Sequence, residues 1–204
     1  TTFLLVRHGE TALTAQRRFS GVRTDPDLSE IGRDQLERLA AALDRLAAGP
    51  VHSVLSSPLL RARQSADILA RTLGLPVGID RRLVECDFGE WEGLRWAEIE
   101  RDWPAELAAW LASTAVAPPG GESFDTVASR VRQLRDELLQ THSGRTVLLV
   151  SHVSPIKLLV SLALAAPVGS IYRMELSAGS VTVAQWYKDG QTSLRSYNDT
   201  SHLR

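Results

Sequence analysis

Two histidines in this sequence follow nearly identical apolar runs. His8 comes after Leu4-Leu5-Val6-Arg7, and His152 comes after Leu148-Leu149-Val150-Ser151. A short, continuous apolar run is typical of a strand that is buried on both faces of a parallel sheet. Because the carboxyl ends of parallel strands lie at one edge of the sheet, we expect the two imidazoles to stand side by side.

Two arginines are expected at the same edge. Arg7 directly precedes His8, and Arg61 lies one turn into a helix that we expect after a second strand, with Ser57 as N-cap and Pro58 as first residue. A guanidinium presents paired donors that match two oxygens of a phosphoryl group. In a chain of net charge −1, this cluster of cations and imidazoles predicts a site for a phosphate dianion.

A neutral imidazole beside such cations can also do covalent chemistry. Its free nitrogen is a nucleophile near neutral pH and can carry a phosphoryl group, which divides one difficult transfer into two easier steps. Gly9 lets the backbone turn sharply beside the substrate. We expect backbone N–H groups around Gly9 and at the Ser154-Pro155 helix start to add positive potential. The pattern therefore indicates phosphoryl transfer.

The leaving oxygen of such a transfer needs a proton, and one acidic segment can supply it. Residues 83–93 carry four carboxylates beside Phe88 and Trp91, namely Glu85, Asp87, Glu90 and Glu92. Desolvation by an aromatic ring raises the pKa of a carboxyl group, which then holds a proton until the alcohol leaves. The pattern by itself does not choose among the four.

Strand-like and helix-like segments alternate along most of the chain. We expect buried strands at 3–6, 51–55, 77–79 and 146–150. We expect helices at 28–47, 58–72, 123–142 and from 154 onward, then a hairpin of 174–177 with 181–187 and an edge strand near 194–197. This alternation predicts an α/β fold: a three-layer α/β/α sandwich with a mostly parallel central sheet.

The length of 204 residues fits a single domain with a small helical cap. We place the cap at roughly 91–123, because a helical hairpin at 96–111 is broken by Pro104 and followed by a Pro-Gly loop at 118–121. The sequence does not begin with Met, which agrees with a domain excised from a longer chain.

Composition excludes several classes of protein. With 44% hydrophobic and 23% charged residues, the chain has enough apolar surface to fold, and its net charge of −1 gives no support for binding nucleic acid or an anionic membrane. The most apolar stretch, 158–168, is shorter than the roughly 20 residues that span a bilayer. Cys86 is the single cysteine, so we expect no internal disulfide. This agrees with a protein of the reducing cytoplasm.

The ordered set of motifs resembles the histidine phosphatase superfamily, which has the phosphoglycerate mutase-like fold. The matching pieces span nearly the whole chain: Arg7-His8-Gly9-Glu10-Thr11, Gly21, Ser29 with Gly32, Ser56–Ala62, Glu85 with Phe88-Gly89, Gly121-Glu122-Ser123 and Val150-Ser151-His152. The resemblance implies that His8 is the phosphorylated nucleophile and Glu85 the proton donor. It also implies that Arg7, Arg61 and His152 hold the phosphoryl oxygens.

The resemblance favours a phosphatase over a mutase. Phosphoglycerate mutases follow the acid with Arg-His-Tyr and carry a longer cap, whereas Cys86-Asp87-Phe88 follow Glu85 here. Phe88–Gly93 and Pro119–Ser123 resemble the α-ribazole phosphatase and broad-specificity acid phosphatase branch. A metal-independent acid phosphatase for a small phosphomonoester, without a cofactor, is therefore expected. A phosphomutase and a non-catalytic phospho-ligand-binding module are the alternatives.

The chain is also similar to the phosphatase half of actinobacterial proteins that carry a ribonuclease H domain. Covalent fusion to such a domain is therefore an expectation for the full-length protein.

The expected substrate-binding set is Arg7, Thr11, Thr14, Gly21, Arg61, His152 and Val153. Thr11 and Thr14 either donate to a phosphate oxygen or satisfy the backbone of a turn. Val153 stands where many relatives have Gly. Without a matching ligand set at the strand ends, we expect no metal. We expect the three histidines outside the motifs to lie on the surface: His52, His142 and His202.

Overall fold

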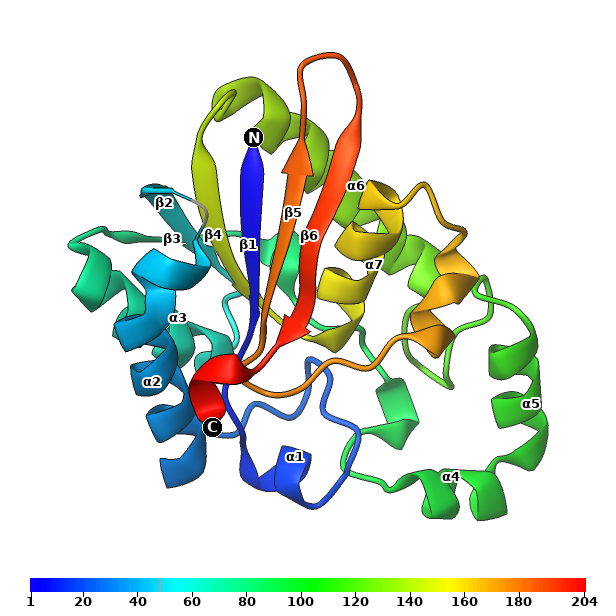
Figure 1. The fold of residues 1–204 in the computed structure, drawn as a ribbon. Coiled ribbons are helices and arrows are strands. Elements are labelled where there is room, and N and C mark those ends of the chain that lie inside the picture. The colour runs from blue at the N-terminus through cyan, green and yellow to red at the C-terminus, as the bar shows by residue number, and fades with distance from the viewer. Residues whose placement is uncertain (48) are drawn as a thin grey trace.

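The computed structural model describes residues 1–47 and 49–204 and contains one six-stranded sheet, ordered β3-β2-β4-β1-β5-β6 (Figure 1). The strands are β1 (Thr2–Arg7), β2 (Val51–Ser56), β3 (Val77–Ile79), β4 (Thr146–Ser151), β5 (Val181–Trp186) and β6 (Thr192–Asp199). The pairs β3–β2, β2–β4 and β4–β1 are parallel, whereas β5 and β6 add an antiparallel edge. The prediction of an α/β fold with a mostly parallel sheet is confirmed.

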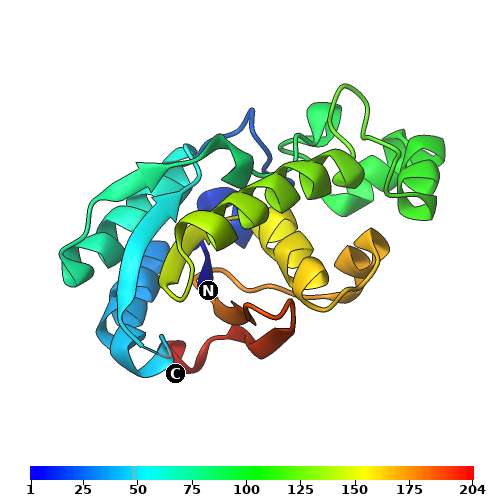
Figure 2. The same cartoon turned by 90° about the horizontal axis from the view of Figure 1, so that it is seen from above.

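Helices cover both faces of this sheet (Figure 2). The helices α2 (Glu30–Leu46) and α3 (Leu60–Leu73) share a buried apolar cluster with Leu4 and Val6 of β1. The helices α6 (Phe124–Thr141) and α7 (Val153–Ala163) share another with Phe3 and Leu5. Successive side chains of a strand point to opposite faces, so β1 contributes to two cores and the layers number three.

Two short helices lie beside the sandwich, where we expected the cap. They are α4 (Trp96–Asp102) and α5 (Pro104–Ala112), and they meet at Trp103. Proline at the first position of a helix leaves no N–H unpaired, so Pro104 begins the second helix while it ends the first. The aromatic rings of Trp91, Trp110 and Phe124 pack this segment against the core.

Some predicted element boundaries are wrong. Helix α3 begins at Leu60 and has Leu59 as an N-cap without a side-chain hydrogen bond. Ser57 precedes the helix by three residues: its hydroxyl accepts from the N–H of Leu59 at 3.3 Å and lies 2.8 Å from Nε2 of His152. The four-residue helix α1 (Ala12–Ala15) was not expected. Residues 174–177 form no strand, since β6 takes the position beside β5.

His202 is not a surface residue. It is 8% exposed, in a short 3-10 turn (Ser201–Leu203) that contacts α2, and its Nε2 lies 3.0 Å from the carbonyl of Gly179. The prediction failed because chain-terminal packing depends on distant contacts. Among the described residues, no helix is both long enough and apolar enough to cross a membrane.

Candidate active site

The register of the sheet brings the two motif histidines together. Strands β1 and β4 pair in parallel with Arg7 opposite Ser151, so the next residues, His8 and His152, leave the sheet as neighbours. The centroids of their rings are 5.1 Å apart, and the rings are tilted by 57°. The arrangement expected from two similar apolar runs is thus present in the structure.

His8 is held in one orientation and one protonation state. It is 4% exposed, and its Nδ1 lies 2.7 Å from the carbonyl oxygen of Gly9. A carbonyl only accepts, so Nδ1 carries the hydrogen and Nε2 keeps its lone pair. Burial and the nearby guanidinium groups of Arg61 and Arg7 lower the pKa of His8 well below 6.5. The imidazole is therefore neutral and nucleophilic at neutral pH.

Gly9 is required for packing against α2. A Cβ on Gly9 would collide with the backbone of Gly32 and the side chain of Leu36, both in α2. Gly21 is similarly enclosed, because a Cβ there would meet the Glu92 carboxylate and lie 2.6 Å from the carbonyl of Cys86. Both glycines permit close approach of chain segments around the site.

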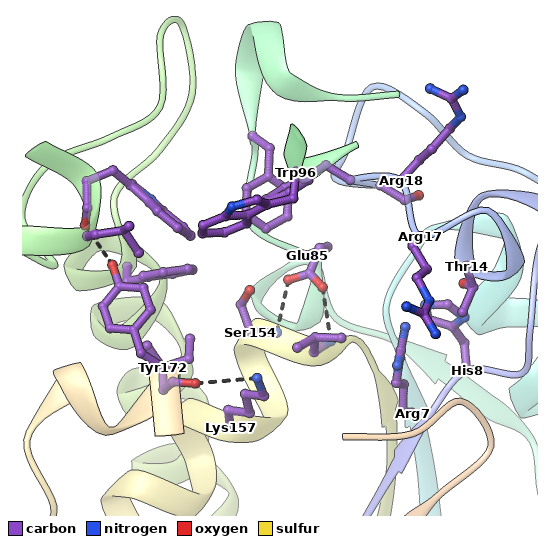
Figure 3. Close-up of a pocket in the computed structure, with 18 residues that line it drawn as sticks. Arg7, His8, Thr14, Arg17, Arg18, Glu85, Trp96, Ser154, Lys157 and Tyr172 are labelled. Carbon is purple, nitrogen blue, oxygen red and sulfur yellow. Dashed lines mark hydrogen bonds between the residues drawn. The ribbon is translucent and has the colours of Figure 1, made fainter. Parts of the chain in front are cut away.

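Arg7 lies in the wall of the main cavity beside His8 (Figure 3). Its Nη1 donates to the carbonyl of Leu176 at 2.6 Å, while its Nε is buried without a hydrogen-bond partner among the described residues. Burial lowers the pKa of Arg7 to about 10, the Glu85 carboxylate opposes this shift, and Arg61 adds to it. The guanidinium remains charged at neutral pH and faces the cavity.

Arg61 lies behind the cavity wall. Its side chain is fully buried, and its Nη atoms donate to the carbonyls of Gly21 at 2.8 Å and Thr24 at 3.0 Å and pair with Asp25 at 3.2 Å. Burial lowers its pKa, and the carboxylates of Glu85 and Asp25 oppose that shift. Arg61 thus fixes the loop 20–25, and only its Nε lacks a partner in the described part of the chain.

His152 is fully buried beside His8. Its Nε2 lies 2.8 Å from the Ser57 hydroxyl, and its Nδ1 has no partner among the residues that the structure describes. Burial and the positive charge of Arg61 lower the pKa of His152 well below 6.5. Like Arg61, it is not among the residues that line the cavity, and it keeps one buried nitrogen without a partner in the described part of the chain.

Glu85 is the one of the four candidate acids that lines the cavity. Its Oε1 accepts from the backbone N–H groups of Cys86 at 2.8 Å and Ser154 at 3.1 Å, and its Oε2 accepts from Val153 at 3.0 Å (Figure 3). A carboxylate oxygen has two lone pairs, so Oε2 keeps one for a proton. The N–H groups at the start of α7, which we expected to add positive potential, therefore hold this carboxylate.

The other three acids have structural partners. Glu92 accepts backbone N–H groups of residues 22–24, Asp87 pairs with Arg23 at 3.2 Å, and Glu90 is exposed and lies 3.8 Å from the same arginine. Among the described residues, no group of three or more His, Cys, Asp or Glu side chains could hold a metal ion.

The cavity has a volume of about 590 Å³. Of the expected binding residues it contains Arg7, Thr14 and Val153. Thr11 is not in its wall, because the buried Thr11 hydroxyl accepts from the N–H of Thr14 at 3.2 Å and caps α1. Of the two readings of Thr11, the structure therefore favours the structural one.

Several lining residues were missed. They include the cations Arg17, Arg18 and Lys157 and the aromatic side chains of Phe19, Phe88, Trp96, Trp110, Phe124 and Tyr172. Helical spacing was the available signal for Lys157, since it lies four residues after Val153 and three after Ser154 and shares their face of α7. No comparable signal exists for the aromatic residues, which come from separate helices and loops.

The sequence matches the histidine phosphatase superfamily (branch 1) over residues 3–200. It is 49% identical over 204 residues to the bifunctional protein of Mycobacterium tuberculosis, covering all of this chain and 55% of that protein. It is 38% identical over 172 residues to the glucosyl-3-phosphoglycerate phosphatase of Mycolicibacterium vanbaalenii, covering 81% and 75%. It is 31% identical over 207 residues to the metal-independent phosphoserine phosphatase of Arabidopsis thaliana, covering 100% and 83%.

Two solved structures have the same fold. The mycobacterial glucosyl-3-phosphoglycerate phosphatase in complex with VO3 matches with a TM-score of 0.86 at 32% identity, covering 97% of this chain and 98% of that one. The α-ribazole phosphatase of Shigella flexneri matches with a TM-score of 0.85 at 26% identity, covering 98% and 97%. The chain spans only about half the length of the bifunctional protein that it matches.

Proposed function

The chain belongs to the histidine phosphatase superfamily (branch 1), and its relatives include phosphatases. We propose that it hydrolyses phosphomonoesters through a covalent phosphohistidine on His8. The observation that carries the proposal is the state of His8. Its imidazole is neutral, keeps the lone pair of Nε2 and lines a cavity together with Arg7 and Glu85. A nucleophile, a cation and an acid around one cavity are the parts that phosphoryl transfer needs.

In the first step, Nε2 of His8 attacks phosphorus and the bond from phosphorus to the ester oxygen breaks. Protonated Glu85 gives its proton to that oxygen, which leaves as the alcohol. In the second step, water attacks phosphorus of the phosphohistidine, the bond from phosphorus to Nε2 breaks, and Glu85 takes a proton from the water, which leaves free phosphate and neutral His8. Arg7 lines the cavity and holds the phosphoryl oxygens, and Arg61 and His152 contact them through their buried Nε and Nδ1 atoms, which have no hydrogen-bond partner among the described residues. No metal or cofactor takes part.

The depressed pKa of His8 bears on the pH at which the enzyme works. Because burial and two cations keep the imidazole unprotonated well below pH 6.5, the nucleophile survives in acid. This supports the acid phosphatase activity expected from the sequence.

We assign the whole of residues 1–204 to one phosphatase domain of a longer protein. The bifunctional relative, of which the chain covers 55%, supports this assignment. That the remaining part is a ribonuclease H domain, and that the protein works in the cytoplasm, are predictions from the sequence. The size of the protein expressed from its natural gene, with an assay for RNA cleavage in RNA–DNA hybrids, tests the fusion.

The natural substrate is proposed to be a small phosphorylated metabolite. The names of related proteins point to glucosyl-3-phosphoglycerate, phosphoserine and α-ribazole phosphate. A panel containing these three, assayed for phosphate release, tests the α-ribazole phosphatase activity predicted from the sequence.

The decisive experiment is covalent trapping. Rapid acid-free quenching during turnover of a ³²P-labelled ester is expected to leave an acid-labile label on the wild-type protein and none on His8→Ala, which also loses at least about 10³-fold in turnover. His52→Ala, an exposed histidine far from the cavity, is the matched control and keeps both properties. Label on His8→Ala, or its turnover within tenfold of wild type, would refute the nucleophile. Binding without turnover would indicate a phospho-ligand-binding module, and phosphate passed only to another alcohol would indicate a mutase.

A further inference from the structure

Lys157 lies in the cavity wall and plays no part in the chemistry described so far. It projects from α7 toward the space between Ser154 and Tyr172, on the side of Glu85 away from His8 (Figure 3). Its Nζ makes one long hydrogen bond, 3.4 Å to the carbonyl of Ile171. An ammonium has three donors, and no carboxylate in the described part of the chain lies within ion-pair distance of it.

The surroundings of Lys157 make this lack of partners costly. Besides Ser154 and Glu85, the cavity wall contains the apolar or aromatic side chains of Trp110, Leu111, Phe124, Ile171 and Tyr172. The Tyr172 hydroxyl donates to the carbonyl of Trp110 at 2.7 Å and is not directed to the ammonium. Partial burial lowers the pKa of Lys157, the carboxylates of Glu85 and Glu175 oppose the shift, and the Arg7 guanidinium adds to it. A half-buried ammonium among apolar side chains gains most from an anion brought by a ligand.

The other lining cations are engaged elsewhere. Arg18 donates to the carbonyl of Gly93 at 2.6 Å and pairs with Glu98 at 3.2 Å, and Figure 3 shows its guanidinium directed away from the cavity. Arg17 and Arg7 lie on the His8 side. We call the side of Glu85 away from His8 the leaving-group side of the cavity. Within the described residues, Lys157 is the one cation directed into that side. One ammonium matches a ligand group with a single negative charge better than a second phosphate dianion.

The helix fixes where that charge must sit. The N–H groups of Val153 and Ser154 hold the Glu85 carboxylate, and Lys157 follows one helical turn later on the same face. Residues so spaced have Cβ atoms roughly 5–6 Å apart. The ester oxygen receives its proton from Glu85. An anionic group that pairs with Lys157 must therefore be part of the leaving alcohol, a short distance from the ester oxygen.

We propose that Lys157 binds a carboxylate on the leaving alcohol, so that the enzyme prefers phosphomonoesters of apolar, carboxylate-bearing alcohols. This inference rests on the proposed function, because it assumes that the alcohol leaves at Glu85. Lys157 is a specificity residue and takes no part in breaking the bond.

The test compares two nearly isosteric esters, 4-carboxyphenyl phosphate and 4-carbamoylphenyl phosphate, which differ chiefly in charge. Wild-type enzyme is expected to prefer the carboxylate by about tenfold or more in kcat/KM. Lys157→Met brings this ratio to about one, and Lys157→Arg retains most of it because it keeps the charge. Lys188→Met is the matched control, since it removes the only other lysine, which is exposed, and it leaves the ratio as in wild type.

A second measurement needs no variant. The product 4-hydroxybenzoate is expected to inhibit the wild-type enzyme more strongly than 4-hydroxybenzamide, in competition with substrate. A wild-type ratio near one, an unchanged ratio in Lys157→Met, or equal inhibition by both alcohols overturns the proposal. Failure to hydrolyse either ester would instead overturn the proposed function, so the two failures are distinguishable.

Discussion

The two ends of the cavity are built in opposite ways. At the end that we assign to the phosphoryl group, His8 in the cavity wall and Arg61 and His152 behind it are almost fully buried and come from strand ends and a helix that packs on the sheet. At the leaving-group end, Trp96, Leu111 and Tyr172 are 43%, 44% and 38% exposed and come from short helices and turns outside the sheet. The first end is polar and hydrogen-bonded, whereas the second is apolar and holds one cation.

This difference separates chemistry from substrate choice. A nucleophile must keep its tautomer and position, and rigid parallel strands with buried hydrogen bonds provide that. Contacts with the alcohol vary with the substrate, and helices outside the sheet can change without disturbing the sheet. Glu85 lies at the boundary, because the N-terminus of α7 holds it and the same helix carries Lys157.

The largest effect is expected at this boundary. Glu85→Gln keeps the size of the side chain but removes the proton, so turnover of an alkyl phosphate should fall by about 10²–10⁴-fold. The loss on p-nitrophenyl phosphate should be only several-fold, since its alcohol leaves with little protonation. Steady-state kinetics on both esters measure this, and the exposed Glu90→Gln serves as control. Equal losses on both esters would remove Glu85 as the acid.

A smaller effect tests the burial of the phosphoryl end. Because His8 and His152 have a pKa well below 6.5 when folded, the unfolded chain binds more protons as pH falls below 6.5. The free energy of unfolding should therefore decrease between pH 7 and 5.5, with a limiting slope of about 1.4 kcal/mol per pH unit for each imidazole. Urea unfolding at several pH values measures the slope.

The contribution of these two imidazoles is isolated by measuring the same pH dependence for the double variant His8→Gln, His152→Gln. It should show a shallower pH dependence than wild type, whereas the exposed His52→Gln should not. The buried His202, whose pKa is also lowered, contributes equally to both chains and cancels. Identical slopes for wild type and double variant would contradict the idea that both imidazoles are neutral in the folded protein.

The smallest effect belongs to the leaving-group end. Trp96 stacks with Phe19 at a centroid distance of 6.4 Å and is partly exposed beside the cavity. Trp96→Ala should raise KM for aryl phosphates by roughly three- to tenfold, with little change in kcat, because it removes apolar contact but no catalytic group. Leu164→Ala, an exposed apolar residue outside the cavity, is the control. A tenfold fall in kcat would show that the two ends are not separable.

Prediction from sequence worked best where the physics is local. The apolar runs before His8 and His152 depend on near neighbours, and the structure has both strands. Prediction was weakest where side chains serve distant partners. Ser57 contacts His152 instead of capping α3, Thr11 caps a helix that no pattern indicated, and His202 is buried by α2.

By itself, the sequence determined the type of fold and the residues available for chemistry, because strand periodicity, helix spacing and motif order are properties of the chain. Only the tertiary structure decided which of four carboxylates faces the cavity and that Arg61 is turned toward loop 20–25. It also decided that Lys157 lies beside apolar side chains of the cavity wall, with a single long hydrogen bond to Ile171. The reason is physical: burial, charge and hydrogen-bond partners are set by residues far apart in the chain, which meet only when the sheet and its helices have formed.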